Sequence, residues 1–341
     1  MGDEVAIGVV GAGRIGSMHA QLLAGQVAGA QLVVVADALE APAQAVAHAH
    51  GVAATSVAAV IDDPAIDAVA ICSPTETHPD LIVAAAEAGK AIFCEKPISL
   101  DLGEVERALA ATRRAGVALM VGFNRRFDPA HRAVREAVAD GRVGDPHLLR
   151  ITSRDPAPPP LSYAAGSGGL FLDMTIHDFD MARYVAGSEV TEVFARGAIR
   201  IVPELAELGD IDTAVVTLVH ENGCLTVIDN SRRATYGYDQ RVEVLGSRAL
   251  AASENPLEHT ALVADGAGIH RSVLPSFFIE RYRSSYLAQW DAFVAALRGG
   301  TAPPTTGEDG RAALVLGLAA QRSLAESRPV SPTEIVPLDP S

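Results

Sequence analysis

Two short motifs place ionisable side chains where they could do acid–base chemistry. Glu95-Lys96-Pro97 puts a lysine directly after the apolar run Ala91-Ile92-Phe93-Cys94, which has the length and composition of a buried strand. Farther along the chain, Asp173 and His177 stand four residues apart, a spacing that puts two side chains on one face of a helix. A histidine can accept the proton of a hydroxyl group near neutral pH. Lys96, Asp173 and His177 are therefore candidate catalytic residues.

Each of these residues also has an ordinary explanation. Lys96 could be a solvated loop lysine, with Pro97 merely ending the strand, because most lysines are exposed. Asp173 and His177 could be a solvated pair or two ligands of a metal. A third ligand is not evident in the sequence, so no metal site is predicted.

A glycine-rich segment near the N-terminus predicts a dinucleotide site. It directly follows the strand predicted at Val5–Val10 and opens the helix predicted at Ile15–Ala24, which is the context that this fingerprint requires. The first glycine permits a tight turn, the second lets a pyrophosphate approach the backbone, and the third allows close helix–strand packing. The helix N-terminus offers amide donors to the phosphates. The predicted cofactor-binding residues are Gly11, Gly13, Arg14, Ile15 and Gly16.

Asp37 identifies the dinucleotide. It ends the next predicted strand, about 20 residues past Gly16, where an acidic residue binds the adenosine ribose. Its carboxylate would repel the 2′-phosphate of NADP, and Ala38-Leu39-Glu40 contains no cation to offset that repulsion. NAD is therefore the expected cofactor, and a glycine-rich turn without a nucleotide is the alternative.

The elements that would position these residues form two parts. Up to about Gly122, short β-branched runs alternate with alanine-rich helical stretches, which predicts a doubly wound parallel sheet of the Rossmann type. Beyond it, strand-like runs near 190–201, 212–220, 224–230, 241–245 and 260–264 have no helices between them. The predicted fold class is α/β, with an NAD-binding Rossmann domain at 1–122. A substrate-binding and oligomerisation domain at 123–341 is predicted to be α+β, with an open, mainly antiparallel sheet.

In such a parallel sheet, ligands bind beyond the carboxyl ends of the strands. Glu95 and Lys96 follow one predicted strand, and the segment from Ser73 through Thr75 to His78 follows another. We therefore expect Ser73, Thr75, His78, Glu95 and Lys96 at the cofactor, with His78 not catalytic. An ordinary turn before a helix is the equal alternative for 73–78.

Composition excludes several classes of protein. The formal net charge of −15 in 341 residues leaves no basic face for nucleic acid. The uncharged stretch Ile15–Ala36 is interrupted by polar residues and glycines, so it is interpreted as a helix, a turn and a strand rather than a membrane span. The cysteines Cys72, Cys94 and Cys224 are widely separated, which favours buried, reduced thiols and a cytoplasmic location.

The combined motifs resemble the glucose–fructose oxidoreductase / inositol dehydrogenase (Gfo/Idh/MocA) family over essentially the whole chain. The order is the glycine fingerprint, then Glu95-Lys96-Pro97, then the segment 168–180 that carries Asp173 and His177. The resemblance implies NAD(H) in a cleft between two domains and a homotetramer formed through sheet faces. It also implies a catalytic triad, with His177 as base, Asp173 binding the reacting hydroxyl and Lys96 positioning the substrate.

Further matches are to the inositol branch of this family. Arg126, Asp155 and Tyr236 are candidates for the rim of a polyol pocket, where each unmatched polar group would cost roughly 1–3 kcal/mol. Surface salt bridges are an equal alternative for the arginine and the aspartate. One departure concerns the segment Tyr163-Ala164-Ala165-Gly166, where inositol-type members are expected to have a lysine. The exact substrate therefore stays open.

The expected activity is NAD-dependent oxidation of a secondary hydroxyl of a cyclic polyol in polyol catabolism. The favoured reaction converts myo-inositol to 2-keto-myo-inositol (scyllo-inosose). Alternatives are another inositol isomer, a pyranose sugar or an anhydrosugar. A non-catalytic dinucleotide-binding regulator is the alternative of another class, and the presence of Lys96, Asp173 and His177 together argues against it.

Overall fold

The computed structural model describes residues 4–336 of the chain. They form two compact units, one made of the residues up to 124 together with 284–314, the other of 125–283 together with the residues from 315 onward. The first unit therefore includes a late segment of the chain, beyond the boundary expected near residue 122. Within the described range, no helix is both long and apolar enough to cross a membrane.

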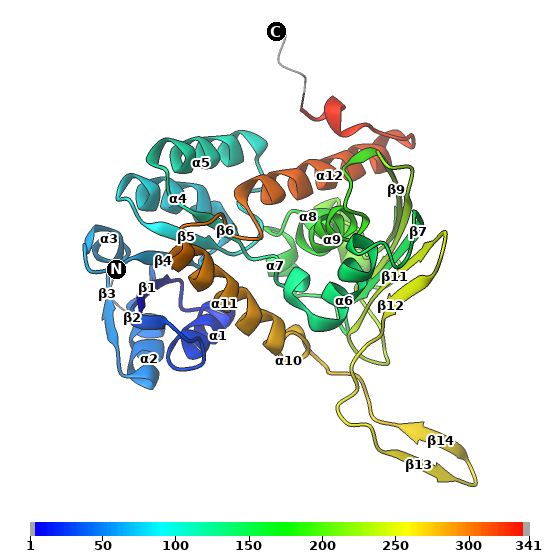
Figure 1. The fold of residues 1–341 in the computed structure, drawn as a ribbon, viewed down its shortest axis with the longest axis horizontal. Helices are drawn as coiled ribbons and strands as arrows, with labels where there is room; N and C mark the ends of the chain where they lie inside the picture. Colours follow the sequence, from blue (N-terminus) through cyan, green and yellow to red (C-terminus); the bar gives the residue numbers. More distant parts are fainter. Residues whose placement is uncertain (1–3, 337–341) are drawn as a thin grey trace. The chain divides into compact units, whose positions relative to one another are not determined.

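The first unit is built on a parallel sheet of six strands in the order β3-β2-β1-β4-β5-β6 (Figure 1). Its strands are β1 Val5–Val10, β2 Ala30–Ala36, β3 Ala53–Thr55, β4 Ala68–Ile71, β5 Ala91–Cys94 and β6 Leu119–Val121. The strand order reverses between β1 and β4, and that reversal opens the crevice where such sheets bind ligands. The predicted doubly wound sheet is confirmed.

Helices connect these strands: α1 Arg14–Leu23, α2 Glu40–His50, α3 Val57–Asp62, α4 His78–Glu87 and α5 Leu102–Ala115, with a 3₁₀ turn, η1, at Thr75–Thr77. The late segment adds most of α11 (Arg283–Gly299), whose Trp290 packs on Phe93 of β5 with ring centroids 4.4 Å apart. Both rings are fully buried. This aromatic contact explains why residues 284–314 belong to the first unit.

The second unit contains a six-stranded sheet in the order β12-β11-β7-β10-β9-β8. Its strands are β7 Pro146–Arg154, β8 Val190–Ala198, β9 Thr213–His220, β10 Leu225–Ser231, β11 Asp239–Gly246 and β12 Leu250–Ser253. All neighbours are antiparallel except β7 and β10, which run parallel. The expectation of an open, mainly antiparallel sheet is confirmed, and a turn at 221–223 joins β9 to β10.

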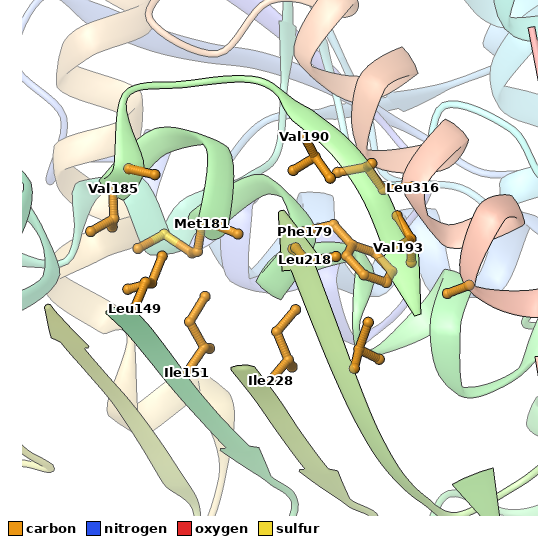
Figure 2. Close-up of a cluster of buried hydrophobic side chains, with 14 of the residues drawn as sticks. Leu149, Ile151, Phe179, Met181, Val185, Val190, Val193, Leu218, Ile228 and Leu316 are labelled. Atoms are coloured by element: carbon orange, nitrogen blue, oxygen red, sulfur yellow. The ribbon is translucent and has the colours of Figure 1, made fainter. Parts of the chain in front are cut away.

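Helices cover one face of this sheet, and Figure 2 shows the resulting core. Those that contribute to this core are α6 Pro129–Ala139, α8 Gly169–Asp173, α9 Ile176–Ala186 and the part of α12 (Gly307–Glu326) from residue 315 onward. The short helices α7 Leu161–Ala164 and α10 Phe278–Arg281 belong to the same unit. Phe179 and Met181 of α9 pack with Leu149 and Ile151 of β7 and with Ile228 of β10. Alternation along each strand sends every second side chain into this core.

The opposite face of the sheet carries exposed apolar side chains, one each from four strands: Val215, Leu225, Leu245 and Leu250. A two-stranded hairpin, β13 (Leu262–Asp265) with β14 (Gly268–Arg271), extends from the same unit and all eight of its strand residues are exposed (Figure 1). The single strand predicted near 260–264 is therefore half of this hairpin.

Candidate active site

The glycine loop of the first unit has the shape that a pyrophosphate needs. Gly11 adopts a φ of +100°, and a Cβ there would lie 2.5 Å from the backbone after β4. A Cβ on Gly16 would lie 1.8 Å from the carbonyl oxygen of Gly11, so the helix can approach the loop only with glycine at that position. A Cβ on Gly13 would meet nothing within 4 Å. The loop is thus closely packed at Gly11 and Gly16 and has open space at Gly13, which fits a bound diphosphate.

The start of α1 adds donors to this loop. Gly13 is the N-cap of the helix, no side chain caps it, and its first turn contains no acidic residue. The first amides of a helix have no acceptor within the helix and carry a partial positive charge. Arg14, Ile15 and Gly16 contribute those amides, so the residues present fit a dinucleotide phosphate.

Asp37 follows β2 and is fixed by two backbone amides. Its Oδ2 accepts a hydrogen bond from the N–H of Ala12 at 2.6 Å, and its Oδ1 accepts one from Leu39 at 2.9 Å. The carboxylate is thereby tied to the glycine loop itself. A negative charge held at this edge fits ribose hydroxyls and opposes a 2′-phosphate.

The segment after β4 is tied to the segment after β5 by His78. This fully buried imidazole lies 2.8 Å from the carbonyl oxygen of Pro97 through Nδ1 and 2.8 Å from that of Ser73 through Nε2. Burial lowers the pKa of His78, although both carbonyl acceptors oppose that shift. Thr75 begins η1 in the same segment. His78 therefore links the two predicted cofactor-binding segments through the backbone.

Glu95 and Lys96 directly follow β5, as predicted, and the Lys96–Pro97 peptide bond is cis. The Glu95 carboxylate is 12% exposed and its Oε1 lies 2.8 Å from Nε2 of His19. Its Oε2 accepts a hydrogen bond from the backbone N–H of Lys96 at 3.3 Å. The glutamate thus contacts both the first helix and the lysine beside it.

In the second unit, Asp173 is held through both carboxylate oxygens. The hydroxyl of Tyr163 donates to Oδ1 at 2.9 Å, and Nη1 of Arg232 donates to Oδ2 at 2.9 Å. The Arg232 side chain is 4% exposed and that of Asp173 is 12% exposed. Tyr163 therefore occupies the segment where a lysine was expected, and it supplies a neutral donor in place of a cation.

Asp155 joins this cluster because of the parallel strand pair. Arg154 of β7 is in register with Ser231 of β10, so Asp155 and Arg232 leave neighbouring strands at the same edge. Oδ2 of Asp155 lies 3.6 Å from Nη1 of Arg232. Burial raises the pKa of Asp155 to about 6; Arg232 opposes this shift and the nearby Asp173 adds to it.

Asp173 and His177 do not share one regular helix, so the expectation that their spacing puts them on one face of a single helix is wrong. Helix α8 ends at Asp173, and α9 begins at Ile176. The backbone hydrogen bonding changes at Thr175, because its N–H and its hydroxyl both lie within hydrogen-bond distance of the carbonyl oxygen of Leu170, five residues earlier. The same hydroxyl lies 2.6 Å from Oδ1 of Asn230. A short polar side chain with a competing partner commonly disrupts a helix in this way.

A buried ion pair anchors the start of α9, one residue after His177. Arg125 donates to Oδ1 of Asp178 at 2.6 Å, and both side chains are almost fully buried. Ser153 and Asn230 lie within hydrogen-bond distance of the same carboxylate, at 2.7 and 2.8 Å. Burial raises the pKa of Asp178, and Arg125 opposes the shift. Sequence patterns did not indicate this network.

The remaining predicted residues have polar partners in the second unit. Arg126 makes a two-point ion pair with Asp180 of α9 at 2.5 and 2.8 Å, which favours its structural alternative. The hydroxyl of Tyr236 donates to Asp239 at 2.6 Å and accepts from Arg154 at 2.8 Å, while about half of its side chain is exposed. Of the three predicted rim residues, Asp155 is the one whose neighbours include Asp173.

Comparison with known proteins finds matches for both parts of the chain. The model of an oxidoreductase family with an NAD-binding Rossmann fold matches residues 5–123, and the model of the GFO/IDH/MocA C-terminal domain matches 131–252. A myo-inositol 2-dehydrogenase of Thermotoga maritima is 49% identical over 97% of this chain and 99% of its own length. An inositol 2-dehydrogenase of Rhizobium meliloti is 49% identical over 96% and 99%.

A solved structure extends the comparison to ligands. The scyllo-inositol dehydrogenase of Lactobacillus casei, crystallised with NAD(H) and scyllo-inositol, is 31% identical, with a TM-score of 0.90 over 97% of this chain and 99% of that one. One family assignment thus accounts for both parts of the sequence, for the parallel and antiparallel sheets, and for the glycine loop. The chain belongs to the GFO/IDH/MocA family of oxidoreductases, with an NAD-binding Rossmann fold in its first unit.

Proposed function

We propose that this protein is an NAD-dependent inositol 2-dehydrogenase that oxidises myo-inositol to 2-keto-myo-inositol in polyol catabolism. The observation that carries the proposal is the carboxylate of Asp173, which accepts hydrogen bonds from Tyr163 and Arg232. Asp155 lies beside it through its own ion pair with Arg232. Such a cluster presents both acceptors and donors to neighbouring hydroxyl groups, as a polyol requires. The inositol dehydrogenases at 49% identity support the choice of substrate.

The proposed chemistry divides the work among three residues. His177 takes the proton of the reacting hydroxyl, Asp173 accepts a hydrogen bond that orients this hydroxyl, and Lys96 positions its oxygen. NAD, when bound, accepts the hydride from the same carbon. Asp173 suits its role because its two fixed oxygens cannot reorient when the substrate arrives.

The cofactor is assigned to Gly11, Gly13, Arg14, Ile15, Gly16 and Asp37, with Ser73, Thr75, His78 and Glu95 completing the nicotinamide side. The open space above Gly13 and the amide-fixed Asp37 support this assignment. Arg126, Asp155 and Tyr236 remain the proposed polyol rim. In the proposed division of the chain, residues 1–122 serve the cofactor, and 123–341 serve the substrate and assembly.

We also propose a cytoplasmic homotetramer assembled through the exposed sheet face of the second unit. Val215, Leu225, Leu245 and Leu250 are each 44–55% exposed and lie one on each of four strands. The register places Leu225, Leu245 and Leu250 in one row across the sheet, and an exposed apolar surface of this kind supports an interaction there. The three buried, free cysteines suit a reducing compartment. Light scattering of the wild-type protein and of Val215→Arg tests the assembly, and a wild-type monomer would contradict it.

A substrate panel tests the function. Purified protein is incubated with NAD or NADP and with myo-, scyllo- and chiro-inositol, glucose and an anhydrosugar, while reduced nicotinamide is followed by absorbance. We expect the highest kcat/KM with myo-inositol and NAD. A preference for scyllo-inositol would move the assignment to the activity named for the Lactobacillus casei relative. Tight NAD binding without turnover of any substrate would favour a dinucleotide-binding regulator.

A further inference from the structure

Glu95 occupies a narrow slot in the first unit, one residue before Lys96. A Cβ on Gly122 would lie 3.0 Å from the carboxyl carbon and from both carboxylate oxygens, so a larger residue there would crowd this side chain. The carboxylate contacts Nε2 of His19 at 2.8 Å and the backbone N–H of Lys96 at 3.3 Å. Its position therefore influences the backbone of the proposed catalytic lysine.

The structure fixes the tautomer of His19. The indole N–H of Trp290 can only donate a hydrogen bond, and it points at Nδ1 of His19 at 2.9 Å. Nδ1 must therefore carry the lone pair, so the hydrogen of the neutral ring is on Nε2. That hydrogen faces Oε1 of Glu95. A directed chain of two hydrogen bonds thus runs from Trp290 through His19 to Glu95.

Packing prevents this imidazole from turning. His19 is fully buried and makes edge-on contacts with Phe93, Tyr286 and Trp290, at centroid distances of 5.2, 5.6 and 5.5 Å. It projects from α1, the helix that begins at the glycine loop, whereas Trp290 belongs to α11. The imidazole therefore connects the helix of the cofactor loop to the turn that carries Lys96.

We propose that His19 and Trp290 are positioning residues that orient Lys96 through Glu95. Trp290 holds His19 as a donor toward Glu95, and the fixed carboxylate then accepts the backbone N–H of Lys96. The proposal rests on the proposed role of Lys96 in polyol oxidation. It assigns a task to a histidine and a tryptophan that touch neither substrate nor reacting atoms.

Two substitutions each remove one hydrogen bond of the series that runs from Trp290 through His19 to Glu95. His19→Phe keeps an aromatic ring but removes the donor to Glu95, and Trp290→Phe keeps an aromatic ring but removes the donor to His19. A hydrogen bond to a charged group contributes enough to change a rate about tenfold or more. We expect kcat to fall about tenfold in His19→Phe and about threefold in Trp290→Phe, while the Kd of NAD stays within about twofold. His19→Gln retains an acceptor and a donor and should recover most of kcat.

A matched variant separates positioning from packing. Phe293 is fully buried in the same aromatic cluster, 5.7 Å from Trp290 by ring centroids. Phe293→Leu disturbs this cluster without removing a member of the hydrogen-bonded chain. It should lower the melting temperature as much as Trp290→Phe does and leave kcat unchanged. An equal loss of kcat in Phe293→Leu would overturn the positioning role.

Nitrogen NMR on the wild-type enzyme tests the tautomer without any folding risk. With ¹⁵N-labelled histidine, and His19 assigned by its missing signal in His19→Gln, Nδ1 should be unprotonated and Nε2 protonated. A protonated Nδ1 would overturn the proposal. Trp290→Phe should shift the His19 signals toward a mixture of tautomers. Trp290 is the single tryptophan of the chain, so its fluorescence reports whether the cluster stays intact in each His19 variant.

Lys96→Met distinguishes this inference from the proposed function. If Lys96→Met loses turnover while His19→Phe and Trp290→Phe keep kcat within about twofold of wild type, the positioning role fails and the function stands. If Lys96→Met itself oxidises the polyol normally, both the function of Lys96 and its positioning by His19 are overturned. Loss in all three variants, with the expected tautomer, supports the proposal.

Discussion

Replacing Asp155 with asparagine should make the protein more stable at neutral pH while removing a proposed substrate contact. Burial raises the pKa of Asp155 from the ordinary aspartate value of about 3.9 to about 6. The native carboxyl group thus holds its proton more tightly than the unfolded one, so the native state loses stability as the pH rises from about 4 to about 6, and the loss is complete above that range. Asparagine has no charge to bury and avoids that cost.

The size of the effect follows from the shift. A shift of about two pKa units corresponds to about 3 kcal/mol. The Asp155 side chain keeps 23% exposure, and partial hydration reduces the expected gain to about 1–3 kcal/mol. At pH 8 the full difference between Asp155→Asn and wild type should appear. At pH 5 the Asp155 carboxyl is mostly protonated in the native state but mostly ionised in the unfolded state, so about half of the stability difference remains.

Urea unfolding in dilute solution at pH 5 and pH 8 measures this difference. Asp239 provides a control of opposite sign: burial alone would raise its pKa, but hydrogen bonds from Arg241, Tyr236 and Asn255 outweigh burial and lower it. Its ionised form therefore stabilises the native state above the unfolded pKa, and Asp239→Asn should destabilise the protein at both pH values. An Asp155→Asn variant no more stable than wild type at pH 8, or equally stabilised at pH 5, would refute the reasoning.

Four further tests by substitution concern the remaining assignments. Lys96→Met should greatly reduce turnover with little change in NAD affinity, and Lys96→Arg should not rescue it because the guanidinium is bulkier and aimed differently; collapsed NAD affinity with normal turnover would make Lys96 a cofactor clamp. His177→Ala should keep NAD binding but lose ~10²–10⁴-fold in kcat, and near-normal turnover with an unchanged pH profile would contradict its role as base. Asp37→Ser combined with Ala38→Arg should narrow or reverse the preference for NAD over NADP, which the ratio of the two kcat/KM values measures. Asp178→Asn should lower the free energy of unfolding by about 3–5 kcal/mol, because it leaves the buried Arg125 without its partner charge; calorimetry showing an unchanged melting temperature would refute this.

The glycine loop shows why much of the first unit could be predicted from sequence. Most of the strands are short apolar runs that end at a turn, and Gly11 and Gly16 have local backbone reasons to be glycine. The short elements β3 and α3 were missed because Ala53–Thr55 and Val57–Asp62 span too few residues to show a period. The return of 284–314 to the first unit depends on aromatic packing of Trp290, which no local pattern encodes.

The cluster around Asp173 shows where sequence reasoning ended. Asp155 and Asp173 were found as acidic residues near motifs, but Arg232 was not, because it becomes their neighbour only through the parallel pairing of β7 with β10. A signal did exist, since Arg232 directly follows a strand-like run, as Asp155 does. The break at Thr175 was equally hidden, because Thr175 also contacts Asn230, 55 residues away, which no local pattern shows.

Isotope transfer tests the proposed oxidation most directly. The enzyme is incubated with NAD and myo-inositol that carries deuterium on carbon 2, and the reduced nicotinamide is analysed by mass spectrometry and NMR. The account predicts that one deuterium moves to NADH, that 2-keto-myo-inositol forms in equal amount, and that His177→Ala loses both products together. NADH without deuterium, or no reduction of NAD by any inositol, would contradict the account.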